Sequence, residues 1–156
     1  MVTIRPMTAA DLQQVLVIEQ SCFPRPWTRD HFLSELASPY ACAAVAVQDG
    51  RVAGYFCLTV VLDEAELLDI AVDPAVHGQG VGRRLLLRVC EEARKRNAGI
   101  LRLEVRATSQ PAISLYERFG FVRSGLRKAY YEQGIDALLM EKNLTEEDVE
   151  QCSLRQ

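Results

Sequence analysis

The 156-residue sequence predicts a single α/β domain built on a mixed β-sheet. Short apolar runs bounded by turn residues alternate with longer segments whose apolar residues recur at helical spacing. One unit has the order strand, helix, strand, which requires a parallel pair, and an Asp-Gly turn between two apolar runs is typical of an antiparallel hairpin. We therefore expect a sheet that is antiparallel at its start and end and parallel in its middle.

The first third of the chain is predicted to hold a short strand, two helices and the hairpin. Residues 2–6 form the strand, and Thr8 caps a helix whose apolar stripe consists of Leu12, Val15, Leu16 and Ile18. The stretch FPRPWT (23–28) contains two prolines and forms a rigid loop, after which Thr28 caps a short second helix. The hairpin occupies residues 41–62.

The middle of the chain carries the parallel unit. Residues 66–72 are apolar enough for a strand, and a loop with three glycines follows them. The next helix has a continuous apolar stripe of Val81, Leu85, Leu86, Val89, Cys90 and Ala93. Residues 100–105 then form a strand parallel to 66–72, because a strand, helix, strand crossover joins parallel neighbours.

The last part of the chain is predicted to add one helix and two strands. Pro111 suits the first turn of a helix, and the runs 121–126 and 136–142 favour an antiparallel pair. We expect one domain over residues 1–142 and a loosely held polar tail over 143–156.

Composition excludes several classes of partner. The net charge is −3 without a basic run, which disfavours nucleic-acid binding, and no apolar stretch approaches the ~18 residues of a membrane span. The two histidines form no metal motif, and the five cysteines include no C-x-x-C pair. We expect a cytoplasmic monomer with reduced thiols and no metal, acting on a protein or a small molecule.

The loop AVDPAVHGQGVGRRLL (71–86) contains the strongest functional motif. Gly78, Gly80 and Gly82 lie where a strand ends and a helix begins, so unpaired N–H groups and the positive end of the helix dipole face any bound ligand. This arrangement favours a phosphate over the alternative that the glycines only supply positive φ angles to a turn.

Three phosphate-binding patterns can be compared with this loop. A dinucleotide fingerprint requires glycine where Arg83 stands, and a Walker A loop requires the absent Gly-Lys-Ser/Thr. The pattern Gln/Arg-x-x-Gly-x-Gly/Ala matches HGQGVG (77–82) at both glycines, with His77 in place of Gln or Arg. Through this loop the chain resembles the GCN5-related N-acetyltransferase (GNAT) family, over about residues 3–142.

Three further stretches narrow the resemblance to the ribosomal-protein-alanine N-acetyltransferases. They are VVLDEAELLDIAVDP (60–74), LEVRATSQPAISLYERFGF (103–121) and KAYYEQGIDALLM (128–140). The resemblance implies a central parallel pair splayed around the cofactor, with helices on both sheet faces. It also implies that acetyl-CoA is held by Ile70, Ala71, Val72, Gly78, Gln79, Gly80, Val81, Gly82, Arg83 and Ser109. Ser109 departs from the usual Asn, so its contact is either lost or bridged by water.

Two residues are candidates for acid–base chemistry. Glu104 alternates with apolar neighbours near the carboxyl end of a parallel strand, although a salt bridge to Arg102 or Arg106 explains it equally well by pattern alone. Tyr116 lies on a buried helical stripe, where a core tyrosine is the alternative. The resemblance implies that Glu104 is the general base and Tyr116 the general acid. A phenol of pKa about 10 then protonates a departing thiolate whose thiol has a pKa of about 8.5.

Three segments are candidates for acceptor binding. The acidic residues Asp63, Glu64, Glu66 and Asp69 could attract a cationic peptide, but such a set is more typical of a solvated hairpin and strand edge. FPRPW (23–27) and the tyrosines at 130–131 could line a peptide groove, as the equivalent segments do in the family, or pack as ordinary loops.

The resulting hypothesis is direct acetyl transfer from acetyl-CoA to the N-terminal α-amine of a protein, a ribosomal protein beginning with alanine. Three alternatives stay open: acetylation of a small amine or an internal lysine, a non-catalytic acetyl-CoA-binding module, and a dinucleotide-binding module. Main-chain amides between residues 78 and 83 would hold the cofactor's pyrophosphate in the first two of these.

Overall fold

The computed structural model describes residues 1–131 and 134–144, which form one seven-stranded sheet in the order β1-β2-β3-β4-β5-β7-β6. The strands are β1 (Val2–Pro6), β2 (Ala41–Gln48), β3 (Arg51–Val61), β4 (Glu64–Val72), β5 (Ile100–Arg106), β6 (Val122–Arg127) and β7 (Ala137–Asn143). All neighbours are antiparallel except β4 and β5, which confirms the predicted mixed sheet.

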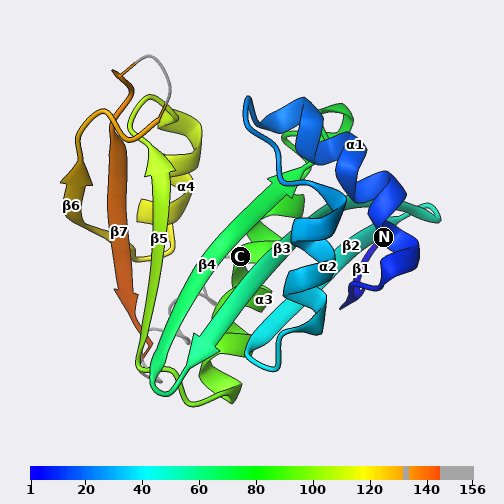
Figure 1. The fold of residues 1–156 in the computed structure, drawn as a ribbon, viewed down its shortest axis with the longest axis horizontal. Coiled ribbons are helices and arrows are strands. Elements are labelled where there is room, and N and C mark those ends of the chain that lie inside the picture. Colours follow the sequence, from blue (N-terminus) through cyan, green and yellow to red (C-terminus); the bar gives the residue numbers. More distant parts are fainter. Residues whose placement is uncertain (132–133, 145–156) are drawn as a thin grey trace.

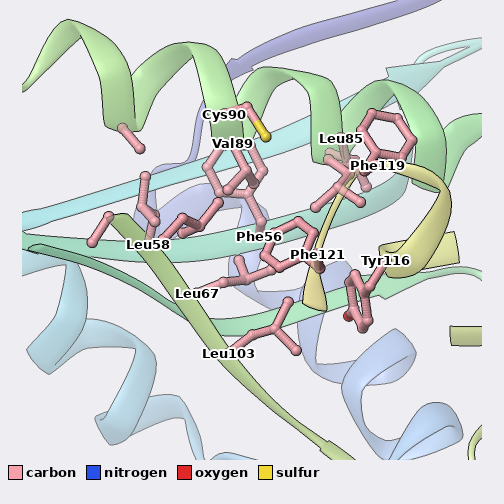
Figure 2. Packing of buried hydrophobic residues seen from close by; sticks show 14 of the residues in the cluster. Phe56, Leu58, Leu67, Leu85, Val89, Cys90, Leu103, Tyr116, Phe119 and Phe121 are labelled. Carbon is pink, nitrogen blue, oxygen red and sulfur yellow. The ribbon is translucent and has the colours of Figure 1, made fainter. Parts of the chain in front are cut away.

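Helices cover both faces of the sheet (Figure 1). They are α1 (Leu12–Cys22), α2 (Arg29–Ala37), α3 (Val81–Lys95) and α4 (Gln110–Arg118). One buried cluster joins α3 and α4 to the sheet, and Figure 2 shows part of it, with Leu85, Phe119, Phe121 and Tyr116 among its members. A second cluster joins α1 and α2 to the opposite face around Phe32 and Tyr55. The sheet is therefore the middle layer of three.

A β-bulge in β4 changes which face its side chains occupy. Cys57 of β3 lies opposite Asp69, but the next residue, Leu58, lies opposite Leu67, so Leu68 is an extra residue in β4. Without it, residues 65, 67, 69 and 71 would share one face. Instead Ala65 and Leu67 pack with α3, whereas Ala71 packs with α1 and α2.

The parallel pair is joined at only one end. Residues Glu64 to Leu67 of β4 pair with Ile100 to Leu103 of β5, and the pairing stops where the bulge begins. Beyond that point β4 continues with β3 and β5 with β7, so the two strands diverge (Figure 1). The splayed pair that the family resemblance implied is thus present in the fold.

Several predicted boundaries differ slightly from the structure. A 3-10 turn (Ala9–Asp11) precedes α1, and the Thr8 N–H donates to Asp11 Oδ2 at 2.8 Å. The loosely held tail was expected to begin at residue 143, but β7 includes Asn143 and Leu144 is buried against the α3 side of the sheet. Residues 145–156 lie outside the described part of the chain.

Two findings bear on the compositional predictions. None of the described helices is both long and apolar enough to cross a membrane. Among the described residues, Cys22, Cys42, Cys57 and Cys90 form no disulfide with one another, and the fifth cysteine, Cys152, lies outside the described residues.

Candidate active site

A cavity of about 480 Å³ opens where β4 and β5 diverge. Its walls come from the unpaired half of β4, the end of β5, the buried side of α4 and the loop between α1 and α2. Its lining includes Glu19, Asp69, Ile70, Glu104, Ser109 and Tyr116. The cavity therefore brings together both predicted catalytic residues and two of the predicted cofactor contacts.

Glu104 reaches this cavity because alternation along β5 turns it away from the buried Leu103 and Val105. The alternative that the sequence pattern left open was an ion pair with Arg102 or Arg106, but the carboxylate pairs with a different arginine. Glu104 Oε1 lies 3.2 Å from Arg127 Nη2, and Arg102 instead pairs with Glu64 and Glu141. With its side chain 25% exposed, Glu104 is available to a ligand in the cavity.

Tyr116 projects from α4 and is 7% exposed, with its ring 5.7 Å from that of Phe121 (Figure 2). Within the described residues its hydroxyl makes no hydrogen bond to the protein. Burial raises the pKa of this hydroxyl above its usual value of 10. A neutral phenol at the cavity wall is thus a hydrogen-bond donor that no described residue satisfies.

The glycine loop combines left-handed backbone with an open helix terminus. Gly78 and Gly80 have φ angles of 82° and 84°, and nothing lies within 4 Å of a Cβ built on either. The first backbone bond of α3 runs from the Arg84 N–H to the Gly80 carbonyl at 3.2 Å. The N–H groups of residues 81–83 therefore have no acceptor inside the helix, which suits an anion.

Two other loop predictions are refined by the geometry. The Gln79 N–H already donates to the Val76 carbonyl at 3.4 Å, so its amide is partly used within the loop. Gly82 has no positive φ, and a Cβ there would make ordinary contacts at 3.6 Å with Leu115 and Val72. The two glycines that need their backbone freedom are Gly78 and Gly80.

The end of β4 presents selected main-chain groups to the gap. The Asp73 N–H donates to the Ala53 carbonyl at 2.8 Å, and alternation along an antiparallel strand then turns Ala71 toward β3 as well. The main-chain groups of Ile70 and Val72 face the gap. His77, which replaces the usual Gln or Arg, places Nε2 2.8 Å from the Val72 carbonyl and so fastens the glycine loop to this strand.

Two of the three segments suggested for acceptor binding, 23–27 and 130–131, contribute to the cavity. Phe23, Pro24, Arg25 and Trp27 line it from the loop after α1. Tyr131 lines it from the other side, and its ring lies 4.5 Å below the Arg106 guanidinium. Tyr130 is 51% exposed and packs edge-on against Tyr131.

The acidic set does not act as one surface. Asp63, Glu64 and Glu66 are exposed, as expected for a hairpin and strand edge, but Asp69 is 8% exposed because the bulge at Leu68 turns it toward α1. There it meets Glu19, which is 2% exposed. Burial, together with the neighbouring Glu19, raises the pKa of Asp69 to about 10.

Sequence reasoning missed Glu19 and the pairing of Asp69, although signals were present. Glu19 follows Leu12 and Val15 on the buried stripe of α1, and Asp69 occupies an apolar-phase position between Leu67 and Ala71. A carboxyl group at a position that the periodicity places on a buried face requires a partner, and this indicates either a functional role or a buried polar network.

The family follows from the match between this geometry and known proteins. A model of the Acetyltransferase (GNAT) family matches residues 12–121. The chain belongs to the GNAT acetyltransferase family. Acetyl-CoA is the acetyl donor of this family, and the open terminus of α3 beside the left-handed Gly80 fits the pyrophosphate of that cosubstrate.

Individual relatives agree with this assignment. The chain is 40% identical to the [ribosomal protein bS18]-alanine N-acetyltransferase of Escherichia coli over 83% of this chain and 86% of the relative. It is 38% identical to the N-alpha-acetyltransferase RimI of Mycobacterium tuberculosis, over 91% and 92%. A crystal structure of the E. coli ribosomal-protein-S18-alanine N-acetyltransferase superposes with a TM-score of 0.86 at 38% identity, covering 93% of this chain and 95% of that one.

Proposed function

We propose that this GNAT acetyltransferase transfers the acetyl group of acetyl-CoA to the N-terminal α-amine of a protein, and that its acceptor is a ribosomal protein that begins with alanine. The observation that carries this proposal is the cavity between β4 and β5, in which Glu104 and Tyr116 face one space from two sides. The names of the similar proteins support the acceptor class.

The donor enters along the gap between the strands. The N–H groups of residues 81–83 hold its pyrophosphate, and Gly78 and Gly80 let the main chain turn around it. The main-chain N–H groups of Ile70 and Val72, which point away from β3, bind the arm that carries the thioester. Because a developing oxyanion needs a fixed donor, one of these two N–H groups stabilises the thioester oxygen.

The acceptor nitrogen attacks the thioester carbon, a C–N bond forms, and the C–S bond breaks. A protein α-amine has a pKa of about 7.7 to 8.0, so a carboxylate acting directly or through one water is a sufficient base. Glu104 takes the proton that leaves the nitrogen. Arg127 keeps the Glu104 carboxylate oriented through their ion pair.

The departing thiolate receives its proton from Tyr116, which is then reprotonated from solvent. The raised pKa of the phenol makes it a weak acid, but the thiolate forms in the same water-poor cavity and becomes more basic for the same reason. No covalent acetyl-enzyme is required, since no step uses a cysteine.

The acceptor itself lies between the 23–28 loop and Tyr131, which flank the mouth of the cavity. The protein acts as a monomer in the cytoplasm, where new ribosomal proteins are available to it. Neither nucleic acid nor a membrane takes part in this reaction.

An acceptor screen with radiolabelled acetyl-CoA tests the proposal. The acceptors are an alanine-initiated peptide with one internal lysine, the same peptide with a blocked N-terminus, and a small polyamine. We expect label only in the first, on the α-amine by mass spectrometry, and loss of turnover in E104Q and Y116F with acetyl-CoA binding retained by calorimetry. Labelling of lysine or polyamine alone, or binding without any turnover, would refute the proposed acceptor.

A further inference from the structure

Glu19 is the centre of a buried polar network that no step of the proposed mechanism uses. Its Oε1 accepts a hydrogen bond from the Tyr55 hydroxyl at 2.6 Å, and its Oε2 accepts one from the Trp27 backbone N–H at 3.0 Å. Tyr55 is fully buried and lies on β3, whereas Trp27 is in the 23–28 loop that follows α1. One carboxylate therefore joins the sheet to a loop that lines the cavity.

Asp69 lines the same cavity as Glu19. Its Oδ2 is buried without a hydrogen-bond partner among the described residues, and the neighbouring Glu19 helps to raise the pKa of Asp69. A proton on Asp69 makes that carboxyl a donor to Glu19 and leaves the pair with a single negative charge. Glu19 then accepts three hydrogen bonds, which is a stable arrangement for a buried carboxylate.

Other contacts also hold the 23–28 loop. Thr28 accepts the His31 N–H as the cap of α2, and the Trp27 ring stacks on His31 with centroids 3.8 Å apart. Phe23 and Trp27 also pack against the buried cluster that joins α1 and α2 to the sheet. The bond from the Trp27 N–H adds a link to Glu19, whose carboxylate is bonded to Tyr55 on β3.

We propose that Glu19 is a positioning residue for the acceptor: held by Tyr55 and Asp69, it fixes the 23–28 loop against β3 and β4 and so shapes the acceptor side of the cavity. This inference rests on the proposed function, since it assigns the loop to the acceptor. Both carboxylate oxygens of Glu19 accept hydrogen bonds from the protein, Oε1 from the Tyr55 hydroxyl and Oε2 from the Trp27 N–H, so we assign Glu19 a positioning role and not a catalytic one.

Trp27 is the only tryptophan in the chain, so its fluorescence reports directly on this loop. The test variants are E19M, which keeps the length of the side chain but has no acceptor oxygen, E19Q, which keeps one, and Y55F, which removes one donor. E64M makes the same change at an exposed carboxylate far from the loop and serves as the matched control.

We expect E19M to increase acrylamide quenching of Trp27 and to raise the acceptor KM about tenfold, the order of magnitude for one hydrogen bond to a buried charge. The acetyl-CoA KM and kcat should change little. E19Q and Y55F should lie between E19M and the wild type, and E64M should match the wild type. Y55F keeps the test decisive if E19M fails to fold.

The inference would be overturned if folded E19M or Y55F had the same Trp27 quenching and acceptor KM as the wild type. An equal rise of the acceptor KM and the acetyl-CoA KM would also overturn it. The fluorescence measurement needs no turnover. If the wild-type protein acetylates no α-amine, the proposed function fails, whereas an altered Trp27 environment in E19M would still establish the link between Glu19 and the loop.

Discussion

The two ends of the β4/β5 pair are built from the same strands and serve different purposes. At the paired end, Arg102 bridges Glu64 and Glu141 on the surface. The alternate residues of the same strand segments, such as Ala65 and Leu67, point to the other face and pack against α3. At the unpaired end, Glu104 faces a cavity two residues further along β5. The difference begins at Leu68, since one extra residue ends the pairing and turns Asp69 to the other face. Whether a charged residue on these strands forms a surface ion pair or faces the cavity thus depends on whether the two strands are paired at its position.

The largest contrast should be between Glu104 and Arg102. We expect E104Q to lower kcat about 10²- to 10⁴-fold, the usual contribution of a general base, and Y116F to have an effect of the same order. R102Q, on the same face of β5 but at the paired end, should keep kcat within about twofold, because an exposed ion pair contributes little. Steady-state kinetics with an alanine-initiated peptide measure all three. Equal losses in R102Q and E104Q would contradict the contrast.

The next largest effect should come from the glycine loop. G80A forces alanine into a left-handed conformation, which costs about 1 to 2 kcal/mol of folding free energy. It should also raise the acetyl-CoA KM about tenfold by moving amides that bind the pyrophosphate. G50A places the same strain in the open turn between β2 and β3, where φ is 75°. It should lose similar stability in urea unfolding with no change in the acetyl-CoA KM.

A third prediction concerns pH and the carboxyl that the bulge buries. Asp69 ionises near its usual pKa of about 3.9 when unfolded and near 10 when folded, so between these values the folded state holds one proton more. Its contribution to stability is therefore complete below about pH 4 and declines as pH rises toward 10. D69N removes this decline. When the free energy of unfolding, measured in urea, is plotted against pH between pH 5 and pH 8, the curves of the two proteins should therefore converge or cross. Parallel curves would mean that Asp69 is ionised in the folded state.

The smallest effect should come from Ser109, which lines the cavity with no side-chain bond capping α4. S109N introduces the residue that the family resemblance led us to expect at this position, and we expect the acetyl-CoA KM to fall about two- to fivefold through one added hydrogen bond. Calorimetry with coenzyme A measures the same change without turnover. An unchanged or weaker affinity would show that serine already makes the contact.

The sequence was most informative where side-chain periodicity decides the structure. The stripe of α3, the Asp-Gly hairpin and the glycines before α3 predicted these elements and the position of the left-handed glycine loop, because each depends on a few neighbouring residues. The tail boundary was misjudged because Leu144 is apolar in a polar surrounding, and its burial depends on contacts with distant strands.

Features that depend on contacts between distant residues were not predicted. Arg127 reaches Glu104 from β6 across β7, which no pattern within β5 can indicate. The bulge at Leu68 is equally hidden, because ELLDIAV is compatible with a regular strand. Asp69 shows the consequence: its apolar-phase position suggests burial, but the face on which it is buried, and hence its partner Glu19, follows from the bulge.

Amide hydrogen exchange along β4, with and without coenzyme A, tests most directly the claim that the unpaired end binds the donor. We predict that the amides of residues 65 and 67 are protected in both states, whereas those of Ile70 and Val72 exchange rapidly in the free protein and become protected at saturating coenzyme A. Protection of Ile70 and Val72 in the free protein, or no change in their exchange when coenzyme A is bound, would contradict the account.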